Sequence, residues 1–206
     1  MRNGHAGHAT LSRGRGERAL NGVAGLVLAA GGGRRYGGPK ALVRHGDQLL
    51  VERAVAAVRD GGCAPVHVVV GAAGAEVRAL GLDVTYVDNP AWKTGMGSSL
   101  RVGLASFAGL AVESVIVLLV DTPGVGPEAV ERLVKVSSPA ALAAATYDGR
   151  RGHPVLLGRE HWAGVIETAS GDEGARRYLA AHDVTEVDCT DLADPLDLDV
   201  PPPTAL

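Results

Sequence analysis

One segment of the sequence combines bare backbone with positive charge: LVLAAGGGRRYGGPKAL, residues 26–42. An apolar run ends at the glycines 31–33, and Arg35 and Lys40 follow in the same loop. Glycine lets the chain adopt positive φ and bring successive backbone N–H groups close to an anion, where a side chain would block the approach. The guanidinium adds a planar fork of donors and the ammonium adds a point charge. This combination indicates a loop that holds a triphosphate.

Two common phosphate-binding fingerprints do not fit the loop. The dinucleotide pattern GxGxxG, begun at Gly31, fails at Tyr36. The phosphate loop GxxxxGK(S/T) fails because Pro39 is inserted before Lys40 and because Ala41 replaces the hydroxyl that binds magnesium. The residue types therefore suit a nucleotide, whereas their spacing belongs to neither pattern.

Apolar runs alternate along the chain with segments of helical periodicity. Strands are expected in GVAGLVLAA, PVHVVVG, DVTYVDNP, SVIVLLVDTPG and DVTEVDCTD. Helices are expected from Lys40 to the Gly61–Gly62 pair, in AAGAEVRAL, in GMGSSLRVGLASF with Ser98 or Ser99 as its cap, from Pro127 to Val136, and near GDEGARRYL. ALAAATYDGRRGHPVLLG is typical of a hairpin that turns at Asp148 and Gly149.

This order of elements predicts an α/β fold. We expect a three-layer, doubly wound, mostly parallel sheet with helices on both faces and one antiparallel hairpin. Ligands of such sheets bind at the carboxyl ends of the strands. The glycine-rich segment follows the first expected strand, which places it at that edge.

Composition narrows the class of protein. A chain of 206 residues suits one domain, which we expect over residues 21–206 behind a disordered lead-in, residues 1–20, that is rich in Gly, Arg and His. The net charge of −3 provides no general basic field, so nucleic acid is not an expected partner. The apolar runs are too short to span a membrane. Cys63 and Cys189 stand far apart without metal-ligand spacing, which predicts free thiols in a cytoplasmic protein.

Five segments together resemble the MobA-like nucleotidyltransferases, in particular the molybdenum cofactor cytidylyltransferase branch. LAAGGGRRYGGPKAL is similar to the family signature LAAGxSxRMGxPK, from which it departs at Gly33 and Tyr36. The other segments follow in the family's order: NPAWKTGMGSSLRVGL, LVDTPGV, RGHPVLLGREHW with GDEGARRYL after it, and the closing DLDVPP, where Val200 replaces a threonine. The first motif is common to many nucleotidyltransferases, and the ordered set is far more specific. The resemblance covers residues 23–202 and implies a Rossmann-like nucleotidyltransferase fold.

The resemblance implies which residues bind a nucleoside triphosphate, either CTP or another one. The loop after the first strand would hold the base edge and the phosphates through Ala29, Ala30, Gly31, Gly32, Gly33, Arg35 and Lys40. A later segment would frame the base and the ribose through Asn89, Gly97 and Ser98. Lys40, Arg35 and Asp121 would be catalytic, because they offset charge that grows on the α-phosphate and on the departing pyrophosphate.

The resemblance also implies a magnesium (Mg²⁺) site. Asp121 ends the most apolar strand, where the family places a magnesium-binding aspartate. Asp197 and Asp199 either complete this site from the tail or are ordinary loop residues.

Three further residues are candidates for the acceptor side. His153 shapes either the acceptor pocket or a turn, and a catalytic role is its alternative. Asp172 and Arg176 stand at the start of an expected helix, where they either cap the helix or contact the acceptor.

The resemblance implies transfer of CMP from CTP to the terminal phosphate of a molybdopterin-type acceptor. The product would pass to a molybdenum hydroxylase apoenzyme. Two alternatives stay open: an NAD(P)H-dependent oxidoreductase of the nicotine blue type, which occurs in the same family, and a non-catalytic molybdenum cofactor carrier. A nicotinamide dinucleotide contains adenosine and pyrophosphate, so the same loop could hold it.

Overall fold

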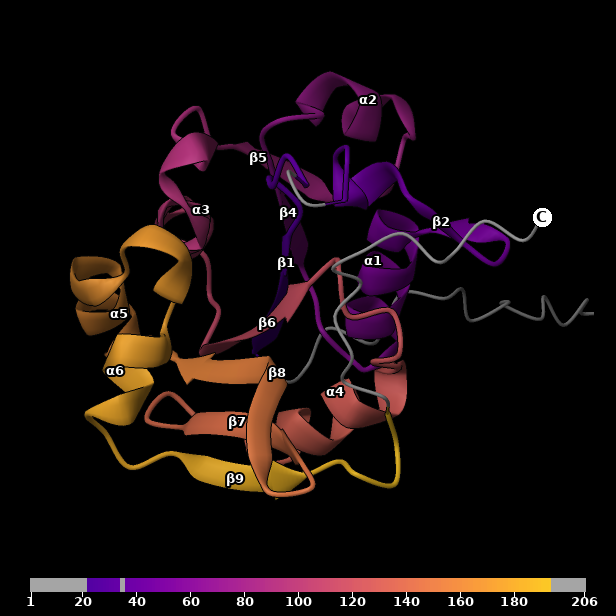
Figure 1. Ribbon diagram of the computed structural model, residues 1–206. Helices are drawn as coiled ribbons and strands as arrows, with labels where there is room; N and C mark the ends of the chain where they lie inside the picture. Colours follow the sequence, from indigo (N-terminus) through magenta and orange to yellow (C-terminus); the bar gives the residue numbers. More distant parts are fainter. Residues whose placement is uncertain (1–21, 34–35, 194–206) are drawn as a thin grey trace, which may run out of the picture.

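A seven-stranded sheet runs through the centre of the molecule (Figure 1). The computed structural model describes residues 22–33 and 36–193. The strands of the sheet lie in the order β5 (Thr85–Asp88), β4 (Val66–Val70), β1 (Val23–Leu28), β6 (Ser114–Leu119), β8 (Arg150–Gly158), β7 (Leu142–Tyr147) and β9 (Thr185–Asp188). Strand β8 is antiparallel to both β6 and β7, and every other neighbouring pair is parallel. The predicted mostly parallel sheet is confirmed.

Strands β1 and β6 form the centre of the sheet, because they pair with each other over six residues and are flanked on both sides. All six residues of β1 are buried, and so are the first five of β6. A strand covered on both faces needs apolar residues at every position, which explains the continuous apolar runs. The loops that follow these two strands lie at the same edge of the sheet.

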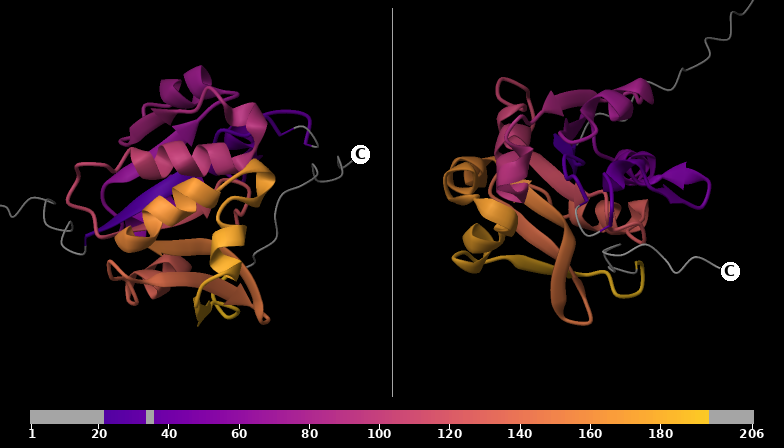
Figure 2. Two further views of the ribbon diagram at one scale, coloured as in Figure 1. Left: turned by 90° about the vertical axis from the view of Figure 1, so that its left-hand side faces the viewer. Right: turned by 45° about the horizontal axis from the view of Figure 1, so that its top comes forward.

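Helices cover both faces of the sheet, as Figure 2 shows. One face carries α1 (Leu50–Asp60), α2 (Gly74–Ala79) and α4 (Pro127–Val134). The other carries α3 (Met96–Ala105), α5 (Trp162–Thr168) and α6 (Arg176–Ala180). Four short 3-10 turns complete these layers: η1 (Lys40–Leu42), η2 (Trp92–Thr94), η3 (Arg159–His161) and η4 (Gly171–Glu173). The three-layer arrangement agrees with the sequence-based expectation.

The expected hairpin is present between β7 and β8. Its turn residues Asp148 and Gly149 have φ angles of 49° and 75°, which are the left-handed values that a two-residue hairpin turn requires. The pairing of Val117 in β6 with Val155 in β8 fixes the direction of the returning strand. The first residues of β8 therefore lie near the carboxyl end of β6.

Several element boundaries differ from the prediction. The helix expected from Lys40 begins at Leu50, because the chain first forms η1 and a two-stranded sheet of β2 (Arg44–His45) and β3 (Gln48–Leu49). The carboxylate of Glu52 accepts a hydrogen bond from the Leu49 amide at 2.7 Å and so caps this helix.

The start of α3 also differs, because the helix begins at Met96 after Gly95, so Ser98 and Ser99 lie in its first turn and do not cap it. Helix α4 ends at Val134, two residues before the predicted Val136, and α5 was not expected at all. The predicted lead-in falls outside the described residues. No helix in the described ranges has the length and apolar character that crossing a membrane demands.

Candidate functional site

Three loops meet at the edge of the sheet where β1, β4 and β5 end. The amide of Ala29 donates to the carbonyl oxygen of Val69 at 2.9 Å, and that of Ala72 donates to Ala30 at 3.1 Å. The amide of Asn89 donates to Val70 at 2.9 Å. These bonds hold the glycine loop, residues 29–33, against the turn after β4 and the segment after β5. The predicted loop therefore lies at the carboxyl edge of the sheet, where such folds bind ligands.

Gly33 turns the chain at the end of the glycine loop. Its φ is +58°, and its carbonyl oxygen accepts hydrogen bonds from the amides of Tyr36, Gly37 and Gly38 at 3.0, 2.9 and 3.2 Å. A Cβ at Gly33 would collide with the carbonyl oxygen of Gly38. Serine, which the family signature has here, would not fit this turn without a shift of the backbone.

Gly31 and Gly32 face different surroundings. Gly31 is exposed, and a Cβ built on it would meet nothing within 4 Å. A Cβ on Gly32 would lie 2.9 Å from the six-membered ring of Trp92. Within the described residues, no hydrogen bond uses the amides of Gly31, Gly32 or Gly33. The glycine loop thus offers backbone donors beside open space, as an anion-binding loop must.

Lys40 and Asp121 lie together although 81 positions separate them in the sequence. Lys40 Nζ lies 3.0 Å from Asp121 Oδ2, and both side chains are largely shielded, with 14% and 23% exposure. The second carboxylate oxygen, Oδ1, is buried and has no hydrogen-bond partner among the described residues. An unpartnered buried carboxylate oxygen is costly, and an oxygen of this kind is the ligand that Mg²⁺ prefers. Asp121 therefore fits the predicted role of a metal ligand.

Three predicted members of this charged group lie outside the part of the chain that the structure describes. Arg35, Asp197 and Asp199 fall outside the described residues. Within residues 22–33 and 36–193, no group of three or more His, Cys, Asp and Glu side chains is arranged to hold a metal ion. Asp121 is thus the described part of the predicted metal site.

Asn89 and Ser98, which are predicted to contact the nucleotide, bond each other in the structure. Both are buried, and Asn89 Nδ2 donates to Ser98 Oγ at 2.8 Å and to Ser99 Oγ at 2.9 Å. Asn89 Oδ1 accepts from the amide of Ala91 at 3.0 Å, and Ser98 Oγ donates to Gly95 O at 2.9 Å. Because these polar atoms bond one another, the two side chains shape the segment, and their contact with a nucleotide stays a prediction.

Gly97 is also bare for a packing reason. A Cβ on Gly97 would lie 2.7 Å from Cα of Ser170, so the start of α3 packs directly on the backbone before η4. Gly97 therefore has a role in helix packing, and its nucleotide contact stays a prediction. The three polar or small residues of this segment position α3.

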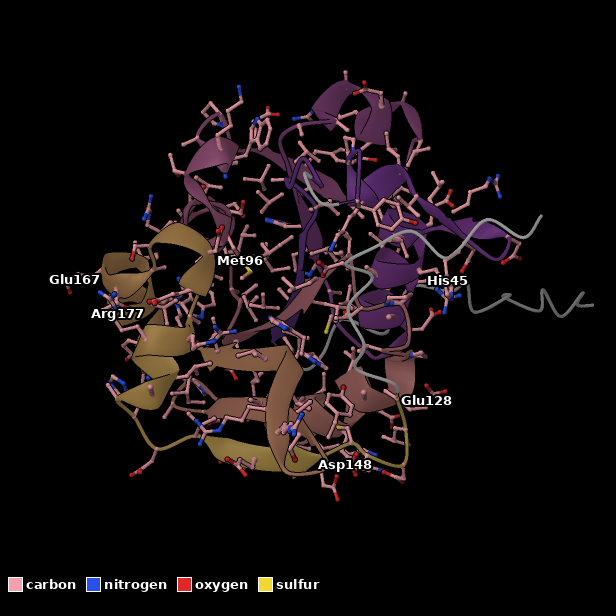
Figure 3. All side chains as sticks on the ribbon, viewed as in Figure 1. His45, Met96, Glu128, Asp148, Glu167 and Arg177 are labelled. Carbon is pink, nitrogen blue, oxygen red and sulfur yellow. The ribbon has the colours of Figure 1, made fainter. Side chains whose placement is uncertain are left out.

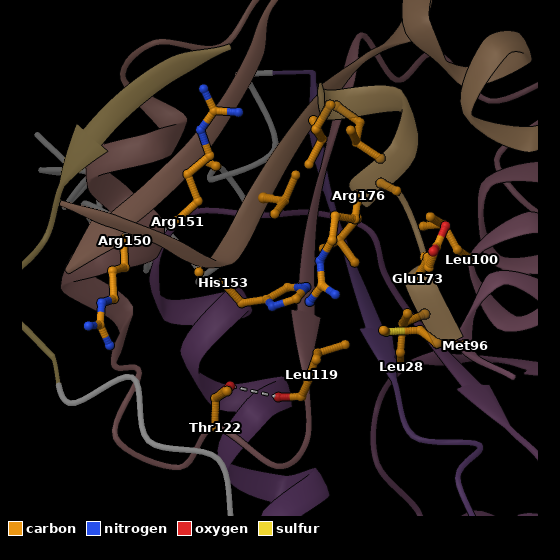
Figure 4. Close-up of a pocket in the computed structure, with 18 of the residues that line it drawn as sticks. Leu28, Met96, Leu100, Leu119, Thr122, Arg150, Arg151, His153, Glu173 and Arg176 are labelled. Carbon is orange, nitrogen blue, oxygen red and sulfur yellow. Dashed lines mark hydrogen bonds between the residues drawn. The ribbon is translucent and has the colours of Figure 1, made fainter. Parts of the chain in front are cut away.

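A cavity of about 780 Å³ opens beside Asp121, on the face of the sheet covered by α3, α5 and α6. Its floor is apolar and comes from α3, β1, β6 and β8, including Leu28, Leu100, Val117 and Val155. Figure 3 labels Met96 of α3 and Asp148 of the hairpin turn, which also line it. The polar side chains around it include those that Figure 4 labels: Thr122, Arg150, Arg151, His153, Glu173 and Arg176. The cavity suits a ligand with a flat apolar part and an anionic part.

His153 and Arg176 point toward each other in the cavity (Figure 4). Burial lowers the pKa of His153 to about 4, the charge of Asp121 opposes this shift, and the charge of Arg176 adds to it. His153 is therefore neutral near pH 7, with one ring N–H to donate. Asp172, by contrast, packs next to Gly95, where a Cβ would lie 2.8 Å from its carboxylate.

Sequence reasoning missed Arg150, Arg151 and Trp92. The arginine pair directly follows the Asp148–Gly149 turn, and a doubled charge at a strand start was the available signal. Trp92 is one of two tryptophans in a chain with 3% aromatic residues, and it stands in a loop between two expected elements. An aromatic residue so placed is a candidate for contact with a ligand or with a loop that binds one.

Comparisons with known proteins find one family model and several similar proteins. A family model described as the MobA-like NTP transferase domain matches residues 25–187. Nicotine blue oxidoreductase of Paenarthrobacter nicotinovorans is 37% identical over 89% of this chain and 95% of that protein. Molybdenum cofactor guanylyltransferase of Rhodobacter capsulatus is 30% identical over 70% of this chain and 67% of that protein.

Solved structures show the same fold. The homologue of Mycobacterium tuberculosis Rv0371c from Mycobacterium sp. strain JC1 superimposes with a TM-score of 0.74 at 31% identity, over 87% of this chain and 91% of that one. Rv0371c of M. tuberculosis H37Rv in complex with manganese gives 0.66 at 26% identity, over 81% and 87%.

Proposed function

The chain belongs to the family of MobA-like NTP transferase domains, and on this premise we propose that it transfers a nucleotidyl group from a nucleoside triphosphate to a phosphorylated small molecule. Our first choice is CMP from CTP to the terminal phosphate of a molybdopterin-type acceptor, followed by delivery to a molybdenum hydroxylase apoenzyme. GTP is the first competitor, because two relatives are named molybdenum cofactor guanylyltransferase. One observation carries the proposal: Lys40 and Asp121 pair at 3.0 Å, and Thr122, directly after Asp121, lines the cavity. Among the described residues, no hydrogen bond uses the amides of Gly31, Gly32 or Gly33.

The proposed reaction joins an oxygen of the acceptor phosphate to the α-phosphorus of the triphosphate. The bond from the α-phosphorus to the β-phosphate oxygen breaks, and pyrophosphate leaves with the electron pair. No general base is needed, because the attacking phosphate oxygen is already negative. The protein's part is alignment and charge neutralisation, which dominate phosphoryl-type transfers.

The described residues divide this work between them. The amides of Gly31, Gly32 and Gly33 would hold phosphate oxygens, and Lys40 would offset negative charge on them. Asp121 would hold a divalent cation through its unpartnered oxygen. When bound, such an ion would neutralise triphosphate charge and polarise a phosphate oxygen.

The cavity would hold the acceptor. Its apolar floor suits a flat heterocycle, and the guanidinium groups of Arg150, Arg151 and Arg176 suit a phosphate. His153, kept neutral by burial, would add a hydrogen-bond donor without drawing the phosphate away from the α-phosphorus by its own charge.

A second candidate function is reduction of a quinone-like acceptor by NADH or NADPH. The specific observation in its favour is the 37% identity to nicotine blue oxidoreductase over nearly the whole length of both chains. In this case the adenosine and pyrophosphate of the cofactor would occupy the glycine loop. The cavity would hold the acceptor that receives the hydride.

One paired assay separates the two candidates. The protein is incubated with magnesium, molybdenum cofactor and each of the four nucleoside triphosphates in turn, and pyrophosphate is measured. In parallel, NADH and NADPH are offered with a quinonoid dye, and their oxidation is followed. We expect pyrophosphate with CTP above all other triphosphates. Pyrophosphate with GTP alone would correct the base, and nicotinamide oxidation without any pyrophosphate would overturn the transferase.

A further inference from the structure

Trp92 covers the glycine loop from the side of the segment after β5. A Cβ on Gly32 would lie 2.9 Å from Cζ3 and 3.0 Å from Cη2 of the indole, and a Cβ on Gly71 would lie 2.8 Å from its Cβ and Cγ. The ring is half-buried, and Lys93 Nζ lies 5.5 Å from its centre. The indole thus spans from the turn after β4 to the glycine loop.

The packing at Gly32 is mutual. The ring occupies the space that a side chain at Gly32 would fill. Glycine is therefore required here by packing within the protein and not by a ligand. Gly31, one position earlier, is bare toward open space. Glycine-rich backbone is costly to order, and among the described residues no hydrogen bond from the amides of Gly31–Gly33 fixes it. Backbone hydrogen bonds hold Ala29, Ala30 and the carbonyl of Gly33, and the indole is the side chain that packs on Gly32 between them.

We propose that Trp92 is a positioning residue for the glycine loop, which acts through Gly32 to hold the loop amides where a triphosphate meets them. This inference rests on the proposed binding of a nucleotide at the loop. It assigns no contact between Trp92 and the reacting atoms.

A double-mutant cycle tests the inference. Affinity for CTP with magnesium is measured by titration calorimetry, with GTP as a second probe, for wild type, Gly32→Ala, Trp92→Ala and the double variant. Each single change should raise Kd roughly tenfold, because a small misplacement of binding groups has effects of this order or larger. The added methyl group has room once the indole is absent. The double variant should therefore lie within about twofold of Trp92→Ala, which is strong non-additivity.

Gly71 provides the matched control. A Cβ there would also lie 2.7 Å from the carbonyl oxygen of Ala30, a contact that removal of the indole does not relieve. Gly71→Ala should therefore keep most of its effect in the Trp92→Ala background, because the contacts with Ala30 O and with the Cβ at position 92 remain. Rescue at both glycines would mean general loosening of the loops and would overturn the assignment to Gly32.

Fluorescence gives a readout that does not depend on turnover. The other tryptophan, Trp162, is 7% exposed and donates its indole N–H to Leu157 O at 2.9 Å. A change in emission on addition of CTP should persist in Trp162→Phe and vanish in Trp92→Phe. Additive effects in the cycle, with normal binding by wild type, would overturn the role of Trp92 alone. Absence of wild-type binding to CTP and GTP would overturn the proposed function and this inference with it.

Discussion

The two sides of the candidate site, the glycine loop and the cavity, offer a ligand different kinds of chemical group. At the loop, the groups that face a ligand are backbone amides, while the nearby polar side chains Asn89 and Ser98 are buried and bond each other. In the cavity, the groups that a ligand would meet are side chains such as Arg150, His153 and Arg176. We therefore expect ligand binding at the loop to be disturbed by added atoms and ligand binding in the cavity to be disturbed by loss of charge.

Lys40 is the exception to this contrast, because it is a charged side chain on the loop side. We expect its removal to have the largest effect on activity. Lys40→Ala should reduce turnover about 10²-fold or more, the scale of losing one electrostatic contact to the transition state. It also leaves the Asp121 carboxylate without the partner at 3.0 Å. Pyrophosphate release is the measurement. The control is Lys135→Ala. Lys135 pairs with Glu131 on the exposed surface at the end of α4, so this variant should keep normal turnover.

Asp121 should separate metal binding from nucleotide binding on the loop side. Asp121→Asn keeps the shape and removes the charge, so activity should fall roughly tenfold to 10²-fold. CTP affinity in the presence of a chelator should stay the same or rise slightly, because a carboxylate beside a triphosphate is repulsive without a cation. Calorimetric titrations of both proteins with magnesium and with chelator decide the point. Equal behaviour in both conditions would make Asp121 a turn residue.

Arg176 should show the sensitivity of the cavity to charge. Arg176→Ala removes a charge-assisted contact, so KM for the acceptor should rise about tenfold while the Kd for CTP stays unchanged. The matched control is the next residue, Arg177, which is 66% exposed and pairs with Glu173 at 3.4 Å. Arg177→Ala should leave both constants near those of wild type. If Arg176→Ala weakened CTP binding as much as acceptor binding, the cavity and the glycine loop would not bind separate substrates.

His153 should give the smallest effect, on stability. Its folded pKa, about 4, lies below that of an unfolded histidine, near 6.5, so the unfolded chain takes up the proton first as the pH falls. Stability from this group is therefore complete above pH 6.5 and is lost toward pH 4. Between pH 7 and 5, Tm should fall less in His153→Asn than in wild type, by about 2–4 °C, as expected from roughly 1 kcal/mol.

Calorimetric scans at the two pH values measure that difference. His67 is also buried, and its burial lowers its pKa as well. His153→Asn should therefore keep part of the pH dependence of stability. Identical slopes in the two proteins would show that His153 is protonated alike in the folded and unfolded states.

The strands and the two principal charges could be predicted from the sequence. Apolar runs over β1 and β6 indicate buried central strands, and the loops after such strands lie at the ligand edge. Lys40 and Asp121 are charged residues of these two loops. The prediction covered their region and not their pairing, because a 3.0 Å contact between residues 81 positions apart depends on the packed fold. The family resemblance supplied the roles that position alone could not.

What could not be predicted has physical causes of its own. Asn89 and Ser98 look like ligand contacts in a polar loop, yet only the folded chain reveals that they satisfy each other. The contact of Trp92 with Gly32 joins two segments far apart in sequence. Helix α5 is seven residues long and carries too short a periodic pattern, and β2 and β3 have two residues each.

The reversed strand β8 has a consequence for how such a protein can change over time. In a wholly parallel sheet, the start of a strand lies at the edge opposite to the ligand, and only the loops after strands can be varied to alter recognition. Here the hairpin turn brings Arg150, Arg151 and His153, at the beginning of β8, to the ligand edge. A lengthened or recharged hairpin tip would thus remodel one substrate's enclosure while the loops after β1 and β4 keep their form. Under the proposed function, the acceptor could therefore be exchanged during evolution without change to the residues that would bind the phosphates.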